Sequence, residues 1–422
     1  MKSASNTPTD SMRLPEEPPG GVTAGLDWAR DDHAVSVVDD RGREKARTTL
    51  THTAAGLGEL VTFLARYHAV EVAIERPDGP VVEALLAAGL TVVVISPNQV
   101  KNLRGRYGSA GNKDDRFDAY VLADTLRTDR ARLRPLIPDS QATVALRRAC
   151  RARKDLVSHR VAVANQLRAH LRNVLPAAVG LFADLDSMIS LAFLTRFDTQ
   201  DKINWLTPKR LGDWLAKQGY SGKVDPAVLH QRLLDAPHGD TGEHATSQAV
   251  ITAGYVALLC TLLEQIKTLS AQIDRQLDAH ADAHIFTSLP RSGRVRAARL
   301  MSEIGDCRSK FPTPESLTCL AGAAPSTRQS GKLRVVGFRW ACDKQLRDAV
   351  TDFAADTRLA NPWAADLYDR ARARGHDHPH AVRILARAWL HIIWHCWQDN
   401  VPYDPAKHRA LQRLTATQIE AA

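Results

Sequence analysis

Apolar and polar positions over the first 135 residues predict a small mixed sheet covered by helices. The pattern predicts five strands, at residues 22–28, 33–38, 45–51, 70–75 and 91–95. Apolar residues at helical spacing predict helices at residues 57–67 and 81–88, shortly before Asp115, and from Asp115 onward. Three hairpin strands followed by helix, strand, helix, strand and helix form the element order of an α/β ribonuclease-H-like fold, which we assign to residues 22–135.

The middle of the chain carries two long amphipathic stripes. Residues 146–174 and 247–279 repeat apolar side chains at helical and heptad-like spacing. We expect the two helices to pair as an antiparallel coiled-coil arm within residues 140–284, with an insertion of short helices at about 193–242. The same stripe could be buried against a second copy, so a homo-oligomer, a dimer or a tetramer, is expected.

The remaining segments have simpler patterns. Residues 1–21 are rich in Ser, Thr, Pro and Glu, which predicts a disordered leader. Residues 285–400 predict a mainly α-helical C-terminal domain that begins with helix, glycine turn and helix. Helix-hairpin-helix elements use this plan to present backbone N–H groups to phosphates, although an ordinary helical hairpin explains it equally well. Residues 403–422 are expected to form a loose tail.

Composition narrows the class of partner. The net charge of +9 and a pI of about 9.3 make nucleic acid the leading candidate. No uninterrupted apolar run reaches the roughly 18 residues that span a bilayer, so no membrane partner is expected. The six cysteines form no CxxC pair, which argues for free thiols in a reducing cytoplasm.

Four carboxylates fall where the predicted fold would gather them. Asp27 lies on the central first strand, Glu75 ends the neighbouring fourth strand, and Asp115 and Asp118 begin the last helix. Taken singly, Asp27 reads as a turn cap, Glu75 as a partner of Arg76, and the last two as a solvated helix start. A converging acidic quartet is costly without cations, and its oxygen ligands suit Mg²⁺ or Mn²⁺. Two such ions can clamp a phosphodiester.

Three short segments give the chain a family resemblance. Gly25-Leu26-Asp27-Trp28, Ala73-Ile74-Glu75 and Lys113–Ala119 resemble the DEDD transposases of bacterial insertion sequences, the "one-ten" group that includes the Piv invertase. Asp114 stands where this group usually has Thr. The resemblance implies an N-terminal domain similar to the RuvC Holliday-junction resolvase, a metal-binding quartet, and recombination of donor and target DNA guided by a structured bridge RNA.

A serine in the C-terminal part is the second candidate for chemistry. Ser330 precedes a glycine and lies among several cations. A serine hydroxyl needs a base or nearby positive charge to act as a nucleophile, so from the residues alone Ser330 reads as a loop serine. The segment Ala321–Lys332 also resembles the family, in which the matching serine joins covalently to DNA. That resemblance implies a nucleophilic role for Ser330, with Ser326 as the second candidate.

Basic residues gather on the polar side of the first long helix and around Ser330. A solvated helix face is the simplest explanation. However, Asp155 is the only acidic residue in this helical stretch, and such an excess of positive charge favours contact with phosphates. The predicted nucleic-acid contacts are Arg147, Arg148, Arg151, Arg153, Lys154, Arg160, Arg328, Lys332 and Arg334. Zinc at the histidines near residues 376–380 and 391–395 lacks a supporting cysteine pair.

Together these observations favour a DNA transposase or recombinase. Asp27, Glu75, Asp115 and Asp118 would bind the metal, and Ser330 would attack DNA. One alternative is a metal-dependent, structure-specific nuclease in which Ser330 is incidental. The other is a non-catalytic nucleic-acid-binding protein on the same scaffold.

Overall fold

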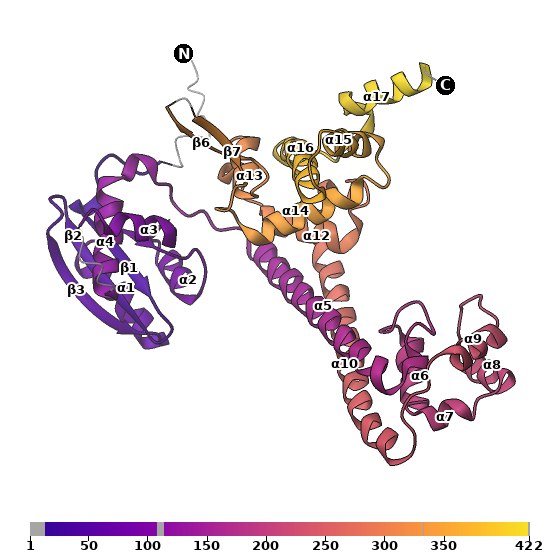
Figure 1. Cartoon of the computed structure of the whole chain (residues 1–422). Coiled ribbons are helices and arrows are strands. Elements are labelled where there is room, and N and C mark those ends of the chain that lie inside the picture. Colours follow the sequence, from indigo (N-terminus) through magenta and orange to yellow (C-terminus); the bar gives the residue numbers. More distant parts are fainter. Residues whose placement is uncertain (1–12, 108–113, 332, 421–422) are drawn as a thin grey trace. The chain divides into compact units, whose positions relative to one another are not determined.

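A computed structural model describes residues 13–107, 114–331 and 333–420, which form two compact units. The first unit contains the chain up to Pro138 together with Cys307–Pro312, and the second contains Asp139–Asp306 and the chain from Thr313 onward (Figure 1). Lys332, one of the predicted nucleic-acid contacts, and Lys113 lie outside the described residues.

The first unit is built on a five-stranded mixed sheet with the order β3-β2-β1-β4-β5. Its strands are β1 (Val22–Trp28), β2 (Asp32–Asp39), β3 (Glu44–Thr51), β4 (Glu71–Ile74) and β5 (Thr91–Val94). The first three strands pair antiparallel, whereas β4 runs parallel to both β1 and β5. This topology confirms the predicted ribonuclease-H-like fold.

Helices cover both faces of this sheet. The helices are α1 (Ala54–Arg66), α2 (Pro80–Ala87), α3 (Pro97–Arg104) and α4 (Asp115–Thr128). Leu60 of α1 and Leu85 of α2 share a core with Leu26, which places these two helices on one face. Val121 and Leu122 of α4 pack with Ala73, so α4 covers the opposite face. Apolar side chains dominate both faces, and the buried hydroxyl of Thr23 is satisfied by a hydrogen bond to the carbonyl of Ala123.

The described part of the expected leader is held against this unit. Buried Arg130 forms a bidentate ion pair with Glu71 and donates hydrogen bonds to the carbonyl oxygens of Pro15 and Glu17. The structure describes this segment from residue 13, and Pro19–Gly21 form a 3-10 turn that leads into β1.

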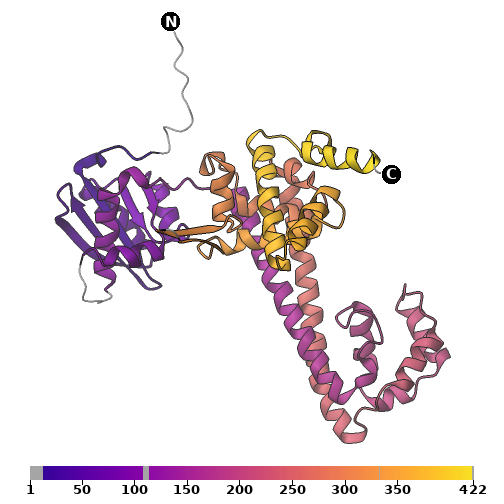
Figure 2. The ribbon, with the colours of Figure 1, turned by 45° about the horizontal axis from the view of Figure 1, so that its top comes forward.

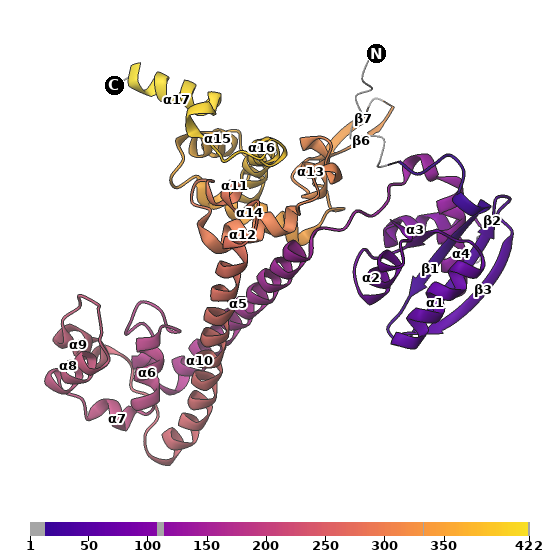
Figure 3. The same cartoon turned by 180° about the vertical axis from the view of Figure 1, so that it is seen from behind.

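Two long helices dominate the second unit. Helices α5 (Gln141–Val174) and α10 (Gly242–Asp278) lie side by side and run in opposite directions (Figures 1 and 3). Between them the chain forms α6 (Met188–Arg196), α7 (Gln200–Asn204), α8 (Pro208–Lys217) and α9 (Pro226–Asp235). Among the described helices, α10 is the one long and apolar enough to cross a membrane, which is weak evidence for a membrane span.

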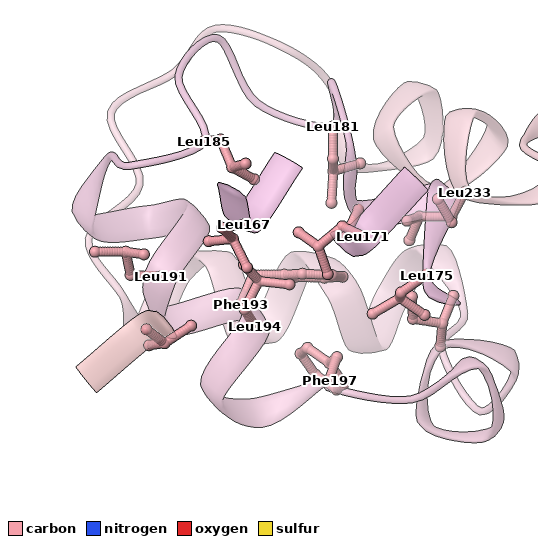
Figure 4. Packing of buried hydrophobic residues seen from close by; sticks show 14 of the residues in the cluster. Leu167, Leu171, Leu175, Leu181, Leu185, Leu191, Phe193, Leu194, Phe197 and Leu233 are labelled. Carbon is pink, nitrogen blue, oxygen red and sulfur yellow. The ribbon is translucent and has the colours of Figure 1, made fainter. Parts of the chain in front are cut away.

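The short helices of the insertion share a hydrophobic core with the arm. Leu167 and Leu171 of α5 pack with Phe193 of α6 and Leu233 of α9 (Figure 4). Phe193 and Phe197 each contact Trp214 edge to face, and they contact each other in a tilted arrangement. Because these contacts bury both partners, the insertion and this end of the arm stabilise each other.

The rest of the second unit is a helical body with one hairpin. Its elements are α11 (Ala283–Thr287), α12 (Gly293–Ile304), α13 (Pro314–Leu320), β6 (Ser326–Ser330), β7 (Leu333–Gly337), α14 (Lys344–Thr357), α15 (Pro362–Ala373), α16 (His378–Gln398) and α17 (Arg409–Glu420). Trp389 and Phe353 are fully buried at its centre. The β6–β7 hairpin, which the sequence analysis did not predict, projects from this body (Figure 2).

The described start of the expected tail packs against the helical body. Tyr403 and Leu411 are buried, and Tyr403 stacks edge to face with Trp389. The backbone N–H of Tyr403 also donates a hydrogen bond to the hydroxyl of Ser288. The tail sequence lacks a long apolar stripe, so these few anchoring side chains were not recognised.

Candidate metal centre and serine hairpin

Neighbouring parallel strands bring Asp27 and Glu75 to the same edge of the sheet. Leu26 of β1 is in register with Ile74 of β4, and the two acids are the next residues along each chain. Side chains alternate along a strand, and Leu26 and Ile74 face α1 and α2. Asp27 and Glu75 therefore lie on the other face, the one that α4 covers.

A glycine allows α4 to lie directly on β1. A Cβ atom at Gly25 would be 2.0 Å from the carbonyl oxygen of Ala119 and 2.4 Å from the amide nitrogen of Ala123. The hydroxyl of Thr23 also donates a 2.8 Å hydrogen bond to the carbonyl of Ala123. Any larger residue at position 25 would push the helix away from the strand, so Gly25 sets the distance between the sheet edge and the start of α4.

The first turn of α4 supplies the remaining two acids. Asp114 is the N-cap, and its side chain accepts a hydrogen bond from the amide of Arg116. The aspartate that replaces the family threonine therefore still caps the helix. Asp115 and Asp118 follow in the first turn, where the positive end of the helix dipole favours negative charge.

Three carboxylates meet at this point. Asp27, Asp115 and Asp118 each offer an oxygen atom, and these atoms all lie within 4.8 Å of one another. We refer to them as the acidic cluster. Glu75 is not part of that group, although its strand ends beside Asp27. The exposure of the three side chains differs: Asp115 is exposed, whereas Asp118 is 1% exposed. Solvent can therefore screen the repulsion between the carboxylates only in part. An oxygen-only group of this kind fits Mg²⁺ or Mn²⁺.

An arginine neutralises the most buried member of the cluster. Arg104, the last residue of α3, binds both carboxylate oxygens of Asp118 through Nε and Nη2. Bidentate pairs of this kind are among the strongest charge-assisted hydrogen bonds. Arg104 therefore provides the positive charge that a metal ion would otherwise supply to Asp118.

Aromatic side chains lie at the same end of the sheet, on its other face. His33 is in register with Trp28, and its Nε2 lies 2.9 Å from Nδ1 of His52. Burial lowers the pKa of His33, and the neighbouring His52 lowers it further. The guanidinium of Arg76 lies over the Trp28 ring at 5.2 Å. These groups support the end of β1 from the side opposite the acidic cluster.

Ser330 lies at the tip of the β6–β7 hairpin. It pairs with Leu333 of β7, and the residue that follows it, Gly331, adopts a φ of +55°. Residues opposite each other in an antiparallel pair share a face, so Ser330, Arg328 and Val335 lie on the same side. The described side chains of both strands, apart from half-buried Ser326, are exposed. Arg334 lies on the other side, opposite Gln329.

Several predicted nucleic-acid contacts on α5 are paired with acids from distant parts of the chain. Arg147 binds Asp139, Arg151 binds Glu303 through two hydrogen bonds, Lys154 binds Asp348, and Arg160 lies 3.2 Å from Asp186. The premise that only Asp155 opposes these cations therefore does not hold in the folded chain. Arg153 donates a hydrogen bond to Ser270 instead, and Arg148 is exposed.

The turn before α12 contains a non-glycine residue in the left-handed backbone region. Arg291 has a φ of +53°, in the left-handed region that favours glycine, and Gly293 has a φ of +57°. The Arg291 side chain forms an ion pair with Asp356, with a distance of 2.9 Å between Nε and the carboxylate. The hydrogen bond to Asp356 and its charge raise the pKa of Arg291, and they hold this turn in place.

The histidines are not gathered into a zinc site. Among the described residues, the acidic cluster is the one group of three or more candidate ligands whose atoms lie within 4.8 Å of one another. Nδ1 of His378 lies 2.8 Å from the hydroxyl of Tyr368, and the ring centroids of His376 and His380 are 4.1 Å apart with the rings tilted by 46°.

The fold and the acidic cluster define a ribonuclease-H-like domain with a candidate divalent-metal site, and comparison with known proteins gives the family. A profile described as a transposase, of the DEDD type, matches residues 24–176, and one described as "Transposase IS116/IS110/IS902 family" matches residues 283–369. A protein from Streptomyces coelicolor, the mini-circle putative transposase for IS117, is 32% identical over 417 residues, covering 95% of this chain and 98% of the relative.

The chain belongs to the IS116/IS110/IS902 family of transposases. The 42 kDa protein of insertion element IS900 from Mycobacterium paratuberculosis is also similar, with 28% identity over 392 residues, 91% of this chain and 98% of that protein. The structure of T. thermophilus RuvC in complex with a Holliday junction substrate matches 27% of this chain and 99% of that chain, at 21% identity and a TM-score of 0.23. Because this TM-score is low, the fold assignment rests on the strand order and the family match. As a member of a transposase family, this enzyme acts on DNA.

Proposed function

We propose that this transposase cuts and exchanges DNA strands with a Mg²⁺- or Mn²⁺-dependent acidic site and a serine nucleophile. The observation that supports this most is the meeting of Asp27, Asp115 and Asp118 at one edge of the sheet. We include Glu75 as the fourth ligand because its strand end adjoins Asp27 on the same face. A bound divalent ion would neutralise and polarise the scissile phosphate.

Ser330 is the proposed nucleophile. Its oxygen would form a bond to phosphorus while the bond from phosphorus to one strand oxygen breaks, leaving the protein joined to one DNA end. The freed strand oxygen takes up a proton. A hydroxyl from another strand end can later attack the same phosphorus, which releases the serine and rejoins the DNA. Arg328 is on the same face of the hairpin and would hold the phosphate and stabilise its developing charge.

The acidic site and the serine would act together as one composite site, supplied by different copies of the chain. Strand exchange needs at least two cut duplexes, which favours a dimer or a tetramer. Helix α10 offers a surface for such an assembly, because Val250, Ile251 and Leu258 are exposed large apolar side chains on it.

Nucleic acid would be held mainly through its backbone. We propose Arg148, Arg328 and Arg334, which are exposed, as the most accessible contacts with donor DNA, target DNA or a structured guide RNA. The paired cations of α5 (Arg147, Arg151, Arg153, Lys154 and Arg160), and Lys332 outside the described residues, complete the proposed set. The protein would act in the cytoplasm, at the bacterial nucleoid.

Replacing the serine separates this proposal from its rivals. Ser330→Ala should abolish any covalent protein–DNA adduct on a cut-site substrate, whereas Ser326→Ala, a matched change in the same strand, should retain it. Retained strand exchange in Ser330→Ala would favour a metal-dependent nuclease site without a serine role. If Asp27→Asn and Asp115→Asn left every activity unchanged, the protein would be a non-catalytic binder.

A further inference from the structure

A cavity of about 600 Å³ lies in the second unit at the base of the β6–β7 hairpin. Residues from α5, the segment after β7, α14 and α16 line it. Four of these residues are cations, namely Lys154, Lys344, Arg347 and Arg383. We call this cavity the cationic pocket. Its size is within the range of sites that hold a small-molecule group.

Two guanidinium groups share one aromatic ring in this pocket. Arg383 lies 4.7 Å and Arg347 5.2 Å from the ring centroid of Phe338. Among the residues the structure describes, neither arginine has a carboxylate within ion-pair distance, and Nη1 of Arg347 is buried without a hydrogen-bond acceptor. Burial, together with the nearby charge of Arg347, lowers the pKa of Arg383. Two cations that contact the same ring and have no carboxylate partner are typical of an anion-binding site.

The carboxylates that line the pocket do not supply that partner. Asp348 is bound by Lys154 and Arg299, and Asp352 is bound by Arg296 at 3.1 Å. Burial acts to raise the pKa of Asp348, but its hydrogen bonds from Lys154 and Arg299 hold it below the ordinary value.

Two helix N-termini near the pocket also contribute positive potential. Lys344 and His378, both in the pocket lining, are the first residues of α14 and α16. The positive ends of two helix dipoles therefore point toward the cavity region. The N-cap aspartates oppose this in part. Asp343 accepts hydrogen bonds from the amides of Gln345 and Leu346, and Asp377 accepts one from the amide of His380 and acts to raise the pKa of Arg383.

An exposed tryptophan lies beside the pocket. Trp340 is 79% exposed, and its ring packs edge to face against Phe338 with a centroid distance of 4.7 Å. An exposed indole offers a flat aromatic surface on which a ligand ring can stack. Aromatic rings next to cationic grooves are the usual means by which proteins stack the bases of single strands.

We propose that the cationic pocket binds a backbone phosphate of single-stranded nucleic acid, with an adjacent unpaired base stacked on Trp340. Duplex nucleic acid would not fit this arrangement, because its bases are already stacked on each other. The inference deepens the proposed function, on which it rests for the class of ligand. It places a single strand next to the hairpin that carries Ser330, so that the strand would be held within the same unit as the nucleophile.

The test measures binding of a fluorescent single-stranded oligonucleotide to the full-length protein by anisotropy, without divalent metal so that no cleavage occurs. Arg347→Gln, Arg383→Gln and Trp340→Ala should each weaken binding about tenfold. The two arginine variants should also reduce the salt dependence of binding, by about 0.7 in the slope for each phosphate that is no longer neutralised. Arg370→Gln, which removes an exposed cation paired with Asp366 on α15, is the matched control and should change affinity little.

Single-stranded DNA and RNA oligonucleotides of the same sequence show which nucleic acid the pocket binds. A loss of affinity for either one in the pocket variants supports the site. Equal losses for duplex and single strands would overturn the proposal, as would losses no larger than that of Arg370→Gln. Because no metal is present, such a failure would leave the metal-dependent cleavage assigned to Asp27, Asp115 and Asp118 untouched.

Discussion

Arg104 and Asp118 form a bidentate ion pair in which the arginine binds both oxygens of the most buried acid in the cluster. A metal ion bound to an oxygen of Asp118 would lie close to the Arg104 guanidinium, and the two positive charges would repel each other. Arg104 therefore competes with the metal, and it also keeps α3 and the start of α4 together while no metal is bound. The acidic cluster is stable without a cation because one of its members already has one.

Replacing Arg104 should shift the balance toward the metal. In Arg104→Gln, the buried Asp118 carboxylate loses its partner, which should cost about 3 kcal/mol of unfolding free energy without metal. Saturating Mn²⁺ should restore much of that loss, and the apparent affinity for Mn²⁺ should rise about five- to tenfold. Thermal unfolding across a Mn²⁺ titration measures both effects.

Arg106→Gln is the control for this experiment. Arg106 follows α3 closely, but it donates to Thr128 and not to the acidic cluster. It should show the wild-type response to Mn²⁺. An Arg104→Gln protein with the same Mn²⁺-dependent stabilisation as the wild type would contradict the competition.

Gly25 should not tolerate a side chain. Gly25→Ala would place its Cβ atom 2.0 Å from the carbonyl of Ala119, so α4 must move away from β1. We expect a loss of about 3 kcal/mol in stability and a weaker stabilisation by Mn²⁺, because Asp115 and Asp118 move with the helix. Gly58→Ala is the matched change, since Gly58 of α1 is exposed and has open space around it. It should be neutral or stabilising by up to about 1 kcal/mol. Equal effects of the two changes would refute this role for Gly25.

The turn before α12 can be tested with two variants of Arg291. Arg291→Gly relieves the left-handed backbone strain but loses the ion pair with Asp356, whereas Arg291→Ala loses the ion pair and keeps the strain. We expect the glycine variant to melt a few degrees above the alanine variant in calorimetry. Indistinguishable melting curves would show that the backbone at Arg291 carries no strain.

Charges on the exposed side of α10 should disrupt the proposed oligomer. Val250→Glu and Leu258→Glu place a carboxylate where a second copy would bury an apolar side chain, which should weaken association about tenfold or more. Light scattering after size-exclusion chromatography gives the mass directly. Leu359→Glu, at another exposed apolar position, should leave the mass unchanged. An unaltered assembly in both α10 variants would rule out this face as the interface.

The sequence predicted the elements whose signals are local. Periodicity located the strands and most helices, and the strand order then placed Asp27 beside the start of α4. The β6–β7 hairpin was missed because its strands are exposed and lack a buried alternating face. The partners of the basic residues on α5 could not be predicted either. Glu303 and Asp348 are far from Arg151 and Lys154 along the chain, and only tertiary packing brings them together. The same holds for Arg104, whose pairing with Asp118 depends on how α3 meets α4.

The most direct measurement is the anomalous scattering of Mn²⁺ in crystals of the protein. The account predicts a peak within coordination distance of carboxylate oxygens from Asp27, Asp115 and Asp118, with Arg104 turned away from Asp118. Absence of a peak at these three carboxylates, in protein that cleaves DNA only when Mn²⁺ is added, would contradict it.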